Sequence, residues 1–403
     1  MTSLPRSLRL LLLLSSGAAA ALTAQRPLSR RQAIAGGLAR SPIAALLSAD
    51  TARAAAEVRG AAVRFLPNLQ ASFTEASPQY HVIGELPLDG AVLRGRRLTV
   101  ARALQQSVRR QFAFNRAALT FDIDTAYTRA LAAAARAGLS TRTAIDADSL
   151  LHIAEARRDA GDASELDVQL AVISAGQQAN TAAVDSLDAM RALLDVQTLI
   201  GERADSITVM LVDSLAVPVD GGALTIVSTP LRVAAAKSLV MAADAQVILE
   251  KRQRFGVPSL TAGFERGDPT GAQTYLLPTV GVALPIPFPG RNRAQVEIAE
   301  VERARAIASL RLTSLESQRQ IARAERERLA ASSRVERDSR LLTTAERVAA
   351  MAMTAYREGA VPLPGVIEAR RNARDVQLQY INDLAALWTA IAAQRLVTEV
   401  EHP

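Results

Sequence analysis

The chain has 403 residues, of which 49% are hydrophobic but only 3% aromatic, with a formal net charge of +7 and no cysteine. Apolar content that depends on Ala and Leu rather than on rings is typical of long helices packed side by side. The lack of cysteine excludes disulfides, thiol nucleophiles, cysteine-bound zinc and a lipidated N-terminal cysteine. The positive net charge is compatible with binding to nucleic acid or to an anionic membrane, or with arginines on solvated helix faces. The small number of aromatic residues argues against binding of single strands by base stacking.

Residues 1–24 have the pattern of a secretory signal peptide. Two arginines precede the apolar run 10–14 and the small residues 18–21, which is the order that export signals share. Cleavage is expected after Ala24, with Ala21 as the alternative. The apolar run is shorter than the roughly 20 residues of a membrane-spanning helix. We therefore expect an exported chain without a helical membrane span.

Two proline-rich segments predict hairpins with alternating faces. Strands are expected at about 67–75 and 79–88, and again at about 258–265 and 274–286. In the last of these, Val280, Val282, Leu284 and Ile286 lie opposite Thr279, Gly281 and Ala283. One apolar face and one small or polar face suit the strands of a transmembrane β-barrel with a wet lumen. Ordinary hairpins on a soluble sheet fit the same pattern.

Long helices are expected at about 94–160 and 291–357, because neither segment contains proline. In the second, a seam of apolar residues recurs every seven positions, as in a left-handed coiled coil. The seam consists of Ala294, Val301, Ala308, Leu315, Ala322 and Leu329. Each long helix ends at a glycine, which allows the chain to reverse, and return helices are expected at about 164–200 and 363–398.

The order helix, hairpin, long helix, turn, helix occurs twice. It predicts a first structural repeat over residues 25–228 and a second over 229–403. Helices beginning near Pro42 and Pro230 precede the two hairpins. One such unit cannot bury its apolar strand faces and helix seams alone, and four strands are too few to close a barrel. The sequence therefore predicts a closed cyclic oligomer.

This duplicated order resembles the TolC-like outer membrane efflux proteins, and most of all the branch that includes heavy-metal cation exporters. The resemblance covers about residues 38–398. It is carried by the paired Pro-aromatic strand starts, by the strand-to-helix corner at 284–293 and by the tip sequences at 158–168 and 356–359. It implies a mainly α fold with a small transmembrane β-barrel contribution: a homotrimer with an α-helical tunnel and a twelve-stranded outer-membrane barrel.

The resemblance also implies partners and site residues. The tunnel, extending into the periplasm, would dock on a periplasmic adaptor (membrane fusion) protein that links it to an inner-membrane pump. The expected adaptor contacts are the residues of the two glycine turns: Gly161, Asp162, Gly359 and Ala360. The expected gate is a constriction of polar side chains just inside the tips: Asp167, Tyr356 and Glu368. Pro362, Pro364 and Gly365 depart from the family pattern in the second tip.

These features predict a passive outer-membrane conduit for export, without cofactor, metal site, catalytic residues or nucleic-acid partner. Metal cations, drugs and proteins are all compatible cargoes. The alternative is a coiled-coil scaffold of the cell envelope that forms no channel, although a scaffold has no use for strands with an apolar face. An enzyme is disfavoured, because His81, His152 and His402 lack metal-binding spacing and no nucleophile–base pair or nucleotide-binding loop is visible. Met351 and Met353 are interpreted as packing residues.

Overall fold

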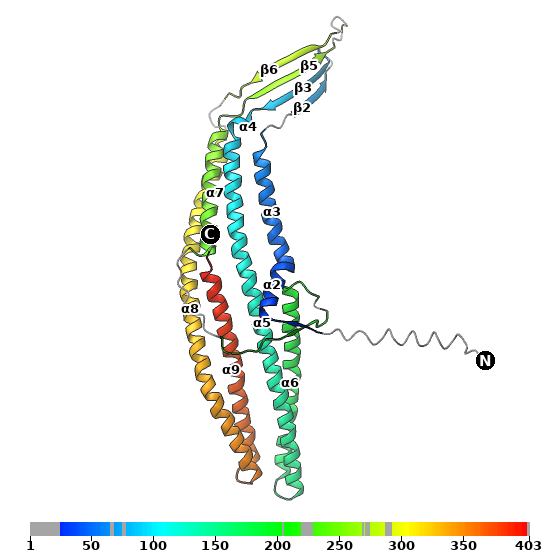
Figure 1. Ribbon diagram of the computed structural model, residues 1–403, viewed down its shortest axis with the longest axis vertical. Helices are drawn as coiled ribbons and strands as arrows, with labels where there is room; N and C mark the ends of the chain where they lie inside the picture. Colours follow the sequence, from blue (N-terminus) through cyan, green and yellow to red (C-terminus); the bar gives the residue numbers. More distant parts are fainter. Residues whose placement is uncertain are drawn as a thin grey trace, which may run out of the picture. The chain divides into compact units, whose positions relative to one another are not determined.

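The computed structural model is mostly helical, with a small sheet (Figure 1). It describes residues 25–64, 68–74, 78–203, 205–218, 229–267, 270, 275–286 and 292–400. The predicted signal peptide, His402 and parts of the strand-turn and corner motifs, including Pro67 and 287–291, lie outside these residues.

The chain forms two compact units, each built from three separate stretches of sequence. The first comprises 1–44, 118–223 and 323–396, and the second comprises 45–117, 224–322 and 397–403. Each unit draws on both halves of the chain, so the units do not coincide with the predicted repeats 25–228 and 229–403. The division into repeats stays a prediction about the sequence.

Two helical hairpins make up most of the first unit (Figure 1). One joins the later part of α5 (Arg94–Asp159) to α6 (Glu165–Leu199), and the other joins the later part of α8 (Arg293–Arg357) to α9 (Leu363–Thr398). The ends of these four helices lie within two residues of those expected. Among the residues that the structure describes, no helix combines the length and the apolar content that a membrane crossing requires.

The N-terminal segment packs against the first hairpin. A short strand, β1 (Arg26–Leu28), pairs in parallel with β4 (Val209–Leu211), and α2 (Arg30–Arg40) follows. Ser29 caps α2 through a reciprocal pair of hydrogen bonds with Gln32. Side chains from these segments, α5 and α6 form the largest apolar core of the unit, with Ile123 and Tyr127 fully buried in it.

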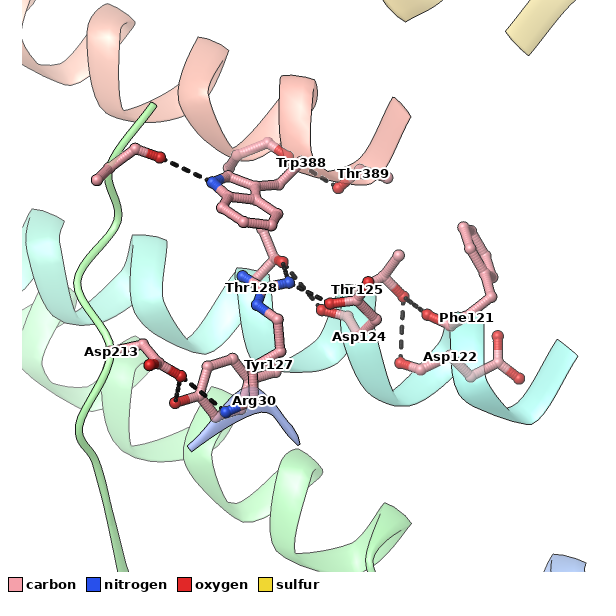
Figure 2. Close-up of polar contacts among 12 residues, drawn as sticks. Arg30, Phe121, Asp122, Asp124, Thr125, Tyr127, Thr128, Asp213, Trp388 and Thr389 are labelled. Carbon is pink, nitrogen blue, oxygen red and sulfur yellow. Dashed lines mark hydrogen bonds and ion pairs between the residues drawn. The ribbon is translucent and has the colours of Figure 1, made fainter. Parts of the chain in front are cut away.

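Arg30 lies at the centre of a polar cluster that joins this N-terminal segment to α5 and α9 (Figure 2). Its guanidinium forms an ion pair with Asp124 and donates to Thr128 Oγ1 at 2.9 Å. The guanidinium carbon is 4.1 Å from the ring centroid of Trp388 and 5.3 Å from that of Tyr127. A cation between two aromatic faces and a carboxylate is held by several weak attractions at once.

The segment around residues 213–216 completes this cluster (Figure 2). Asp213 accepts a hydrogen bond from the Arg30 backbone at 2.7 Å and lies 2.8 Å from the Tyr127 hydroxyl. Trp388 donates its indole N–H to the Ala216 carbonyl at 2.9 Å. Burial, together with the hydrogen bond and charge of Asp213, raises the pKa of Tyr127. The tyrosine therefore stays neutral and serves as a hydrogen-bond donor.

The second unit contains the sheet and the remaining helical segments. Its helices are most of α3 (Pro42–Ala62), α4 (Asp89–Val92), the first part of α5, α7 (Leu231–Gln253) and the first part of α8. The strands are β2 (Asn68–Phe73), β3 (Tyr80–Pro87), β5 (Ser259–Arg266) and β6 (Leu277–Ala283). They form one antiparallel sheet in the order β2-β3-β5-β6, so the two predicted hairpins join through β3 and β5.

The register of this sheet gives it one apolar and one polar face. Cross-strand partners such as Phe73 and Tyr80, Val82 and Phe264, or Leu260 and Val282 lie on the same face. The large apolar side chains of this face are 42–84% exposed: Leu69, Phe73, Tyr80, Val82, Leu260, Phe264, Val280 and Val282. The other face carries mostly polar or small residues: Gln70, Ser72, His81, Glu85, Thr261, Gly263, Glu265, Thr279 and Gly281.

Candidate functional site

The two hairpins of the first unit reverse at glycines with the same backbone geometry. Gly161 and Gly359 have φ angles of 83° and 76°, a region that L-residues with a side chain rarely adopt. In both turns the glycine N–H and the next N–H bond back to the last helical carbonyls, at 2.8–3.0 Å. This pattern is the Schellman motif, which ends a helix and satisfies its free carbonyls. Gly161, Asp162, Gly359 and Ala360 are all exposed.

Asp167 lies in the first turn of α6, where it forms a capping box with Ser164. Its carboxylate accepts the Ser164 backbone N–H at 3.1 Å and the Ser164 hydroxyl at 2.9 Å. The Ser164 oxygen accepts the Asp167 backbone N–H at 3.2 Å. These bonds satisfy donors that a helix start leaves free, so Asp167 has a structural task whether or not it also lines a gate.

Tyr356 is the buried member of the predicted gate. It is 3% exposed and lies in an apolar cluster that joins the ends of both hairpins, with Leu150, Val168 and Val366 among its members. The tyrosine hydroxyl is buried and has no hydrogen-bond partner among the described residues. The ring therefore contributes packing within one chain, and its place in the constriction stays a prediction.

Arg157 connects the two glycine turns. Its guanidinium donates to the Tyr356 carbonyl and, at 3.3 Å, to the Asp162 carbonyl, and its carbon lies 4.7 Å from the centroid of the Tyr356 ring. Burial raises the pKa of Tyr356, Arg157 opposes this through its charge, and the charge of Asp167 adds to the increase. Asp167, Tyr356 and Arg157 thus form one electrostatic group at the ends of the hairpins.

Glu368 is exposed on α9. It lines a cavity of about 1210 Å³ between α5, α6, α8 and α9, which Asp167 and Tyr356 do not line. Four arginines, Arg357, Arg370, Arg371 and Arg374, also line this cavity. The structure therefore brings two of the three predicted gate residues together and places Glu368 among arginines.

Arg157 was not predicted from the sequence. A basic residue in the last turn of a helix is common because it favours the helix dipole, so nothing in the local pattern distinguished Arg157 from Arg158. Its role depends on the approach of α8, which brings the Tyr356 carbonyl within reach. In the described part of the chain, no three His, Asp or Glu residues are grouped so that they could hold a metal ion.

Two further surfaces are left without a partner in the single chain. The edge strands β2 and β6 each pair on one side only within the described sheet. The larger seam residues of α8 are also exposed, with Val301 at 65%, Leu315 at 59% and Leu329 at 51%. Open strand edges and a repeating apolar seam are the features that further copies of a chain can cover.

Comparison with known proteins gives one family and a set of similar folds. Residues 229–398 match the model of a family described as outer membrane efflux proteins. No curated protein sequence matches the chain.

Among solved structures, CusC is 16% identical with a TM-score of 0.74, and the match covers 92% of this chain and 91% of CusC. The outer membrane protein VceC from Vibrio cholerae is 17% identical with a TM-score of 0.73, over 92% of this chain and 95% of VceC. The CmeC outer membrane channel from Campylobacter jejuni is 15% identical with a TM-score of 0.74, over 92% of this chain and 85% of CmeC. At these identities the likeness shows the fold.

Proposed function

We propose that the chain belongs to the TolC-like outer membrane efflux proteins and is the outer-membrane channel of a tripartite export system. In this role it is a passive conduit, and the pump to which it connects supplies the energy. The family is one of channels, so the proposal includes no catalysed reaction. The channel would accept its cargo from the periplasm or directly from an inner-membrane pump.

The amphipathic sheet is the observation that carries this proposal. Its apolar face exposes eight large side chains, among them Val280 at 84%, which is unfavourable in water but favourable against lipid. Its other face is polar enough to border a water-filled lumen. A coiled-coil scaffold has no use for such a sheet, so the channel is favoured over the alternative.

A matched pair of substitutions on β6 tests the orientation of this sheet. Val280→Arg places a charge on the apolar face, whereas Thr279→Arg places the same charge on the opposite face one residue earlier. A charge facing lipid near the bilayer midplane costs roughly 2–4 kcal/mol. We expect V280R to lose insertion into liposomes and heat-modifiable migration in gels, and T279R to keep both while changing conductance. Equal insertion of both variants would contradict the proposed membrane face.

Assembly follows from the surfaces that one chain leaves open. Four strands cannot close a cylinder on their own, and the edges of β2 and β6 need strands from other copies. Three copies would supply a twelve-stranded barrel, and the exposed seam of α8 would be covered by a neighbouring copy in a helical tunnel. The trimer and its periplasmic extension are parts of the proposal, and they are supported by these open edges and by the fold.

The gate assignment is the part of the proposal that rests on single residues. We assign Asp167, Tyr356 and Glu368 to the constriction, with the two carboxylates attracting cations to the passage. Asp167→Asn and Glu368→Gln should each lower cation preference in single-channel recordings, and their combination should lower it further. Asp185→Asn, a change at a half-buried position in the middle of α6, is the control. An unchanged preference in the double variant would remove both residues from the gate.

The glycine turns are proposed as the docking points for the adaptor. Gly161, Asp162, Gly359 and Ala360 are exposed and belong to two turns of the same geometry, so an adaptor could recognise both in the same way. A bulky change such as Ala360→Trp should abolish adaptor binding in pull-down experiments without altering insertion. Retained binding in that variant would move the docking site elsewhere.

A further inference from the structure

Two buried carboxylates face each other across the α8–α9 hairpin. Asp338 on α8 is 8% exposed and Asp383 on α9 is 5% exposed. They lie beside an apolar cluster of the same two helices that includes Val335, Leu384 and Leu387. Carboxylates are rarely buried in such surroundings unless a cation or a proton compensates their charge.

The compensation is unequal. Both carboxylate oxygens of Asp383 accept a hydrogen bond: Arg334 Nε donates to Oδ1 at 2.7 Å and the Gln379 amide donates to Oδ2 at 2.8 Å. Asp338 carries a buried oxygen, Oδ2, that has no hydrogen-bond partner among the described residues. Two arginines of α8, Arg334 and Arg337, act on Asp338 through their charge.

The charged groups that neighbouring elements bring to this part of the hairpin have other partners. Arg136 of α5 donates to the side-chain oxygen of Asn382 at 3.1 Å. Leu215 packs on the same apolar cluster from the segment that follows β4. Its charged neighbour Asp213 is engaged with Arg30 and Tyr127 instead. The acid pair therefore depends on the charged groups of its own hairpin.

These surroundings assign the proton to Asp338. Burial raises its pKa, and the hydrogen bond and charge of Asp383 raise it further. For Asp383, burial also acts to raise the pKa, but hydrogen bonds from Arg334, Gln379 and Asp338 outweigh burial and lower it. Two adjacent buried carboxylates that share one proton avoid the repulsion of a doubly charged pair.

We propose that Asp338 and Asp383 form a proton-dependent clasp between α8 and α9. With one proton, the pair joins the helices by a hydrogen bond. Without it, two like charges are left buried in the hairpin and loosen it. The clasp is a property of the hairpin itself, so it does not depend on the proposed channel function.

The direction of the pH effect follows from the two shifts. Asp338 has a raised pKa, so its contribution to stability is present at low pH and is lost as pH rises through that raised value. Asp383 has a lowered pKa, so its contribution is lost only as pH falls through the lowered value. The clasp is therefore tightest between these two values and opens on the alkaline side.

Hydrogen exchange on the intact detergent-solubilised protein tests the clasp. Protection factors for α8 and α9 around these residues would be measured from about pH 4 to about pH 8, with the α5–α6 hairpin as an internal reference. The wild type should lose protection as pH rises, by up to about tenfold for each unit by which the pKa of Asp338 exceeds its ordinary value. Asp338→Asn, which cannot ionise, should show a flat profile.

Asp375→Asn is the control, because Asp375 is an exposed carboxylate on α9, the helix that carries Asp383. It should keep the wild-type profile. A flat profile in the wild type, a sloping one in D338N or a flat one in D375N would each overturn the proposal. If D338N does not assemble, infrared spectroscopy of the wild type decides. A protonated-carboxyl band that titrates above the ordinary aspartate range supports the clasp, and the absence of such a band overturns it.

Discussion

The hydroxyl of Tyr356 is buried without a hydrogen-bond partner among the described residues, and this leads to a prediction at the scale of one atom. Removing an unsatisfied buried polar group costs little and can stabilise a protein. We therefore expect Tyr356→Phe to change the free energy of unfolding by less than about 0.5 kcal/mol. Tyr356→Ala, which also removes the packed ring, should cost about 3–5 kcal/mol.

Denaturant unfolding of the solubilised protein, followed by circular dichroism, measures both variants. A loss of more than about 1 kcal/mol in Y356F, the worth of a typical hydrogen bond, would mean that the hydroxyl finds a partner in the assembled protein. In that case the tyrosine would bind a group from outside the single chain.

A second prediction at this scale concerns the backbone of Gly359. Its φ of 76° forces a substituted side chain into the left-handed region, although a Cβ there would meet only the end of Arg157, at 3.6 Å. Gly359→Ala should cost about 1–2 kcal/mol through strain alone. Gly138→Ala is the control, because Gly138 lies inside α5 with open space around it and should gain roughly 0.5–1 kcal/mol. Thermal unfolding midpoints of the two variants that shift in the same direction would contradict the expected opposite effects on stability.

Single residues were predictable from the sequence where their task is local. Gly161 and Gly359 were predicted to end helices, because a short pattern marks them. The capping box of Ser164 and Asp167 spans only four positions and is equally local, although it was not predicted. Arg157, Asp338 and Asp383 were not predictable, because their partners lie on other helices. The gate role of Asp167 and Glu368 stays a prediction, since it concerns a passage that no single chain contains.

At the scale of elements, the Arg30 cluster determines how α2, α5 and α9 are joined. Arg30→Ala would leave Asp124, which is 6% exposed, without its ion-pair partner. Breaking one side of a buried pair typically costs about 3–5 kcal/mol. Arg30→Lys should rescue only part of this loss, since an ammonium group cannot stack flat between two rings and donate to Asp124 and Thr128 together.

Tryptophan fluorescence reports directly on this cluster, because Trp388 is the one tryptophan of the chain. Unfolding curves followed by its emission should show R30A as the least stable, R30K as intermediate and the wild type as the most stable. The double variant R30A/D124A should lose less than R30A, because it no longer buries an unpaired carboxylate. A double variant that loses the sum of both single changes would show that the two residues act independently.

The sequence predicted elements well where they are long and repetitive. The four long helices and the four strands of the sheet follow from proline placement, heptad spacing and alternation over many residues. It missed β1 and β4, because strands of three residues are too short to show a period. It also missed α2 as a separate helix, since its capping box at Ser29 and Gln32 lies close to the predicted signal peptide.

At the scale of the whole molecule, the exposed seam of α8 predicts how copies associate. Leu315→Glu places a charge in the middle of the seam, where Leu315 is 59% exposed in the single chain. If the seam packs against a neighbouring copy, the charge must be buried on assembly, and the oligomer should dissociate. Light scattering on the solubilised protein should give a trimer for the wild type and a monomer for L315E.

Ala330→Glu provides the control, because Ala330 is also exposed on α8 but lies off the seam. It should remain trimeric. Dissociation of both variants to the same extent would mean that added negative charge, rather than burial of the seam, disrupts the assembly.

The pairing of β1 with β4 has a consequence for the order in which the chain matures. The Arg30 backbone N–H and the Asp213 carboxylate that accepts its hydrogen bond lie 183 residues apart in sequence. Contacts between such distant positions form late, because a long loop must close first. The N-terminal segment therefore stays unpaired until the segment that contains β4 and Asp213 has folded against it. During that interval Arg26 and Arg30 should be accessible to a protease. Pulse labelling followed by brief trypsin treatment would measure how long the N-terminal segment stays sensitive to cleavage.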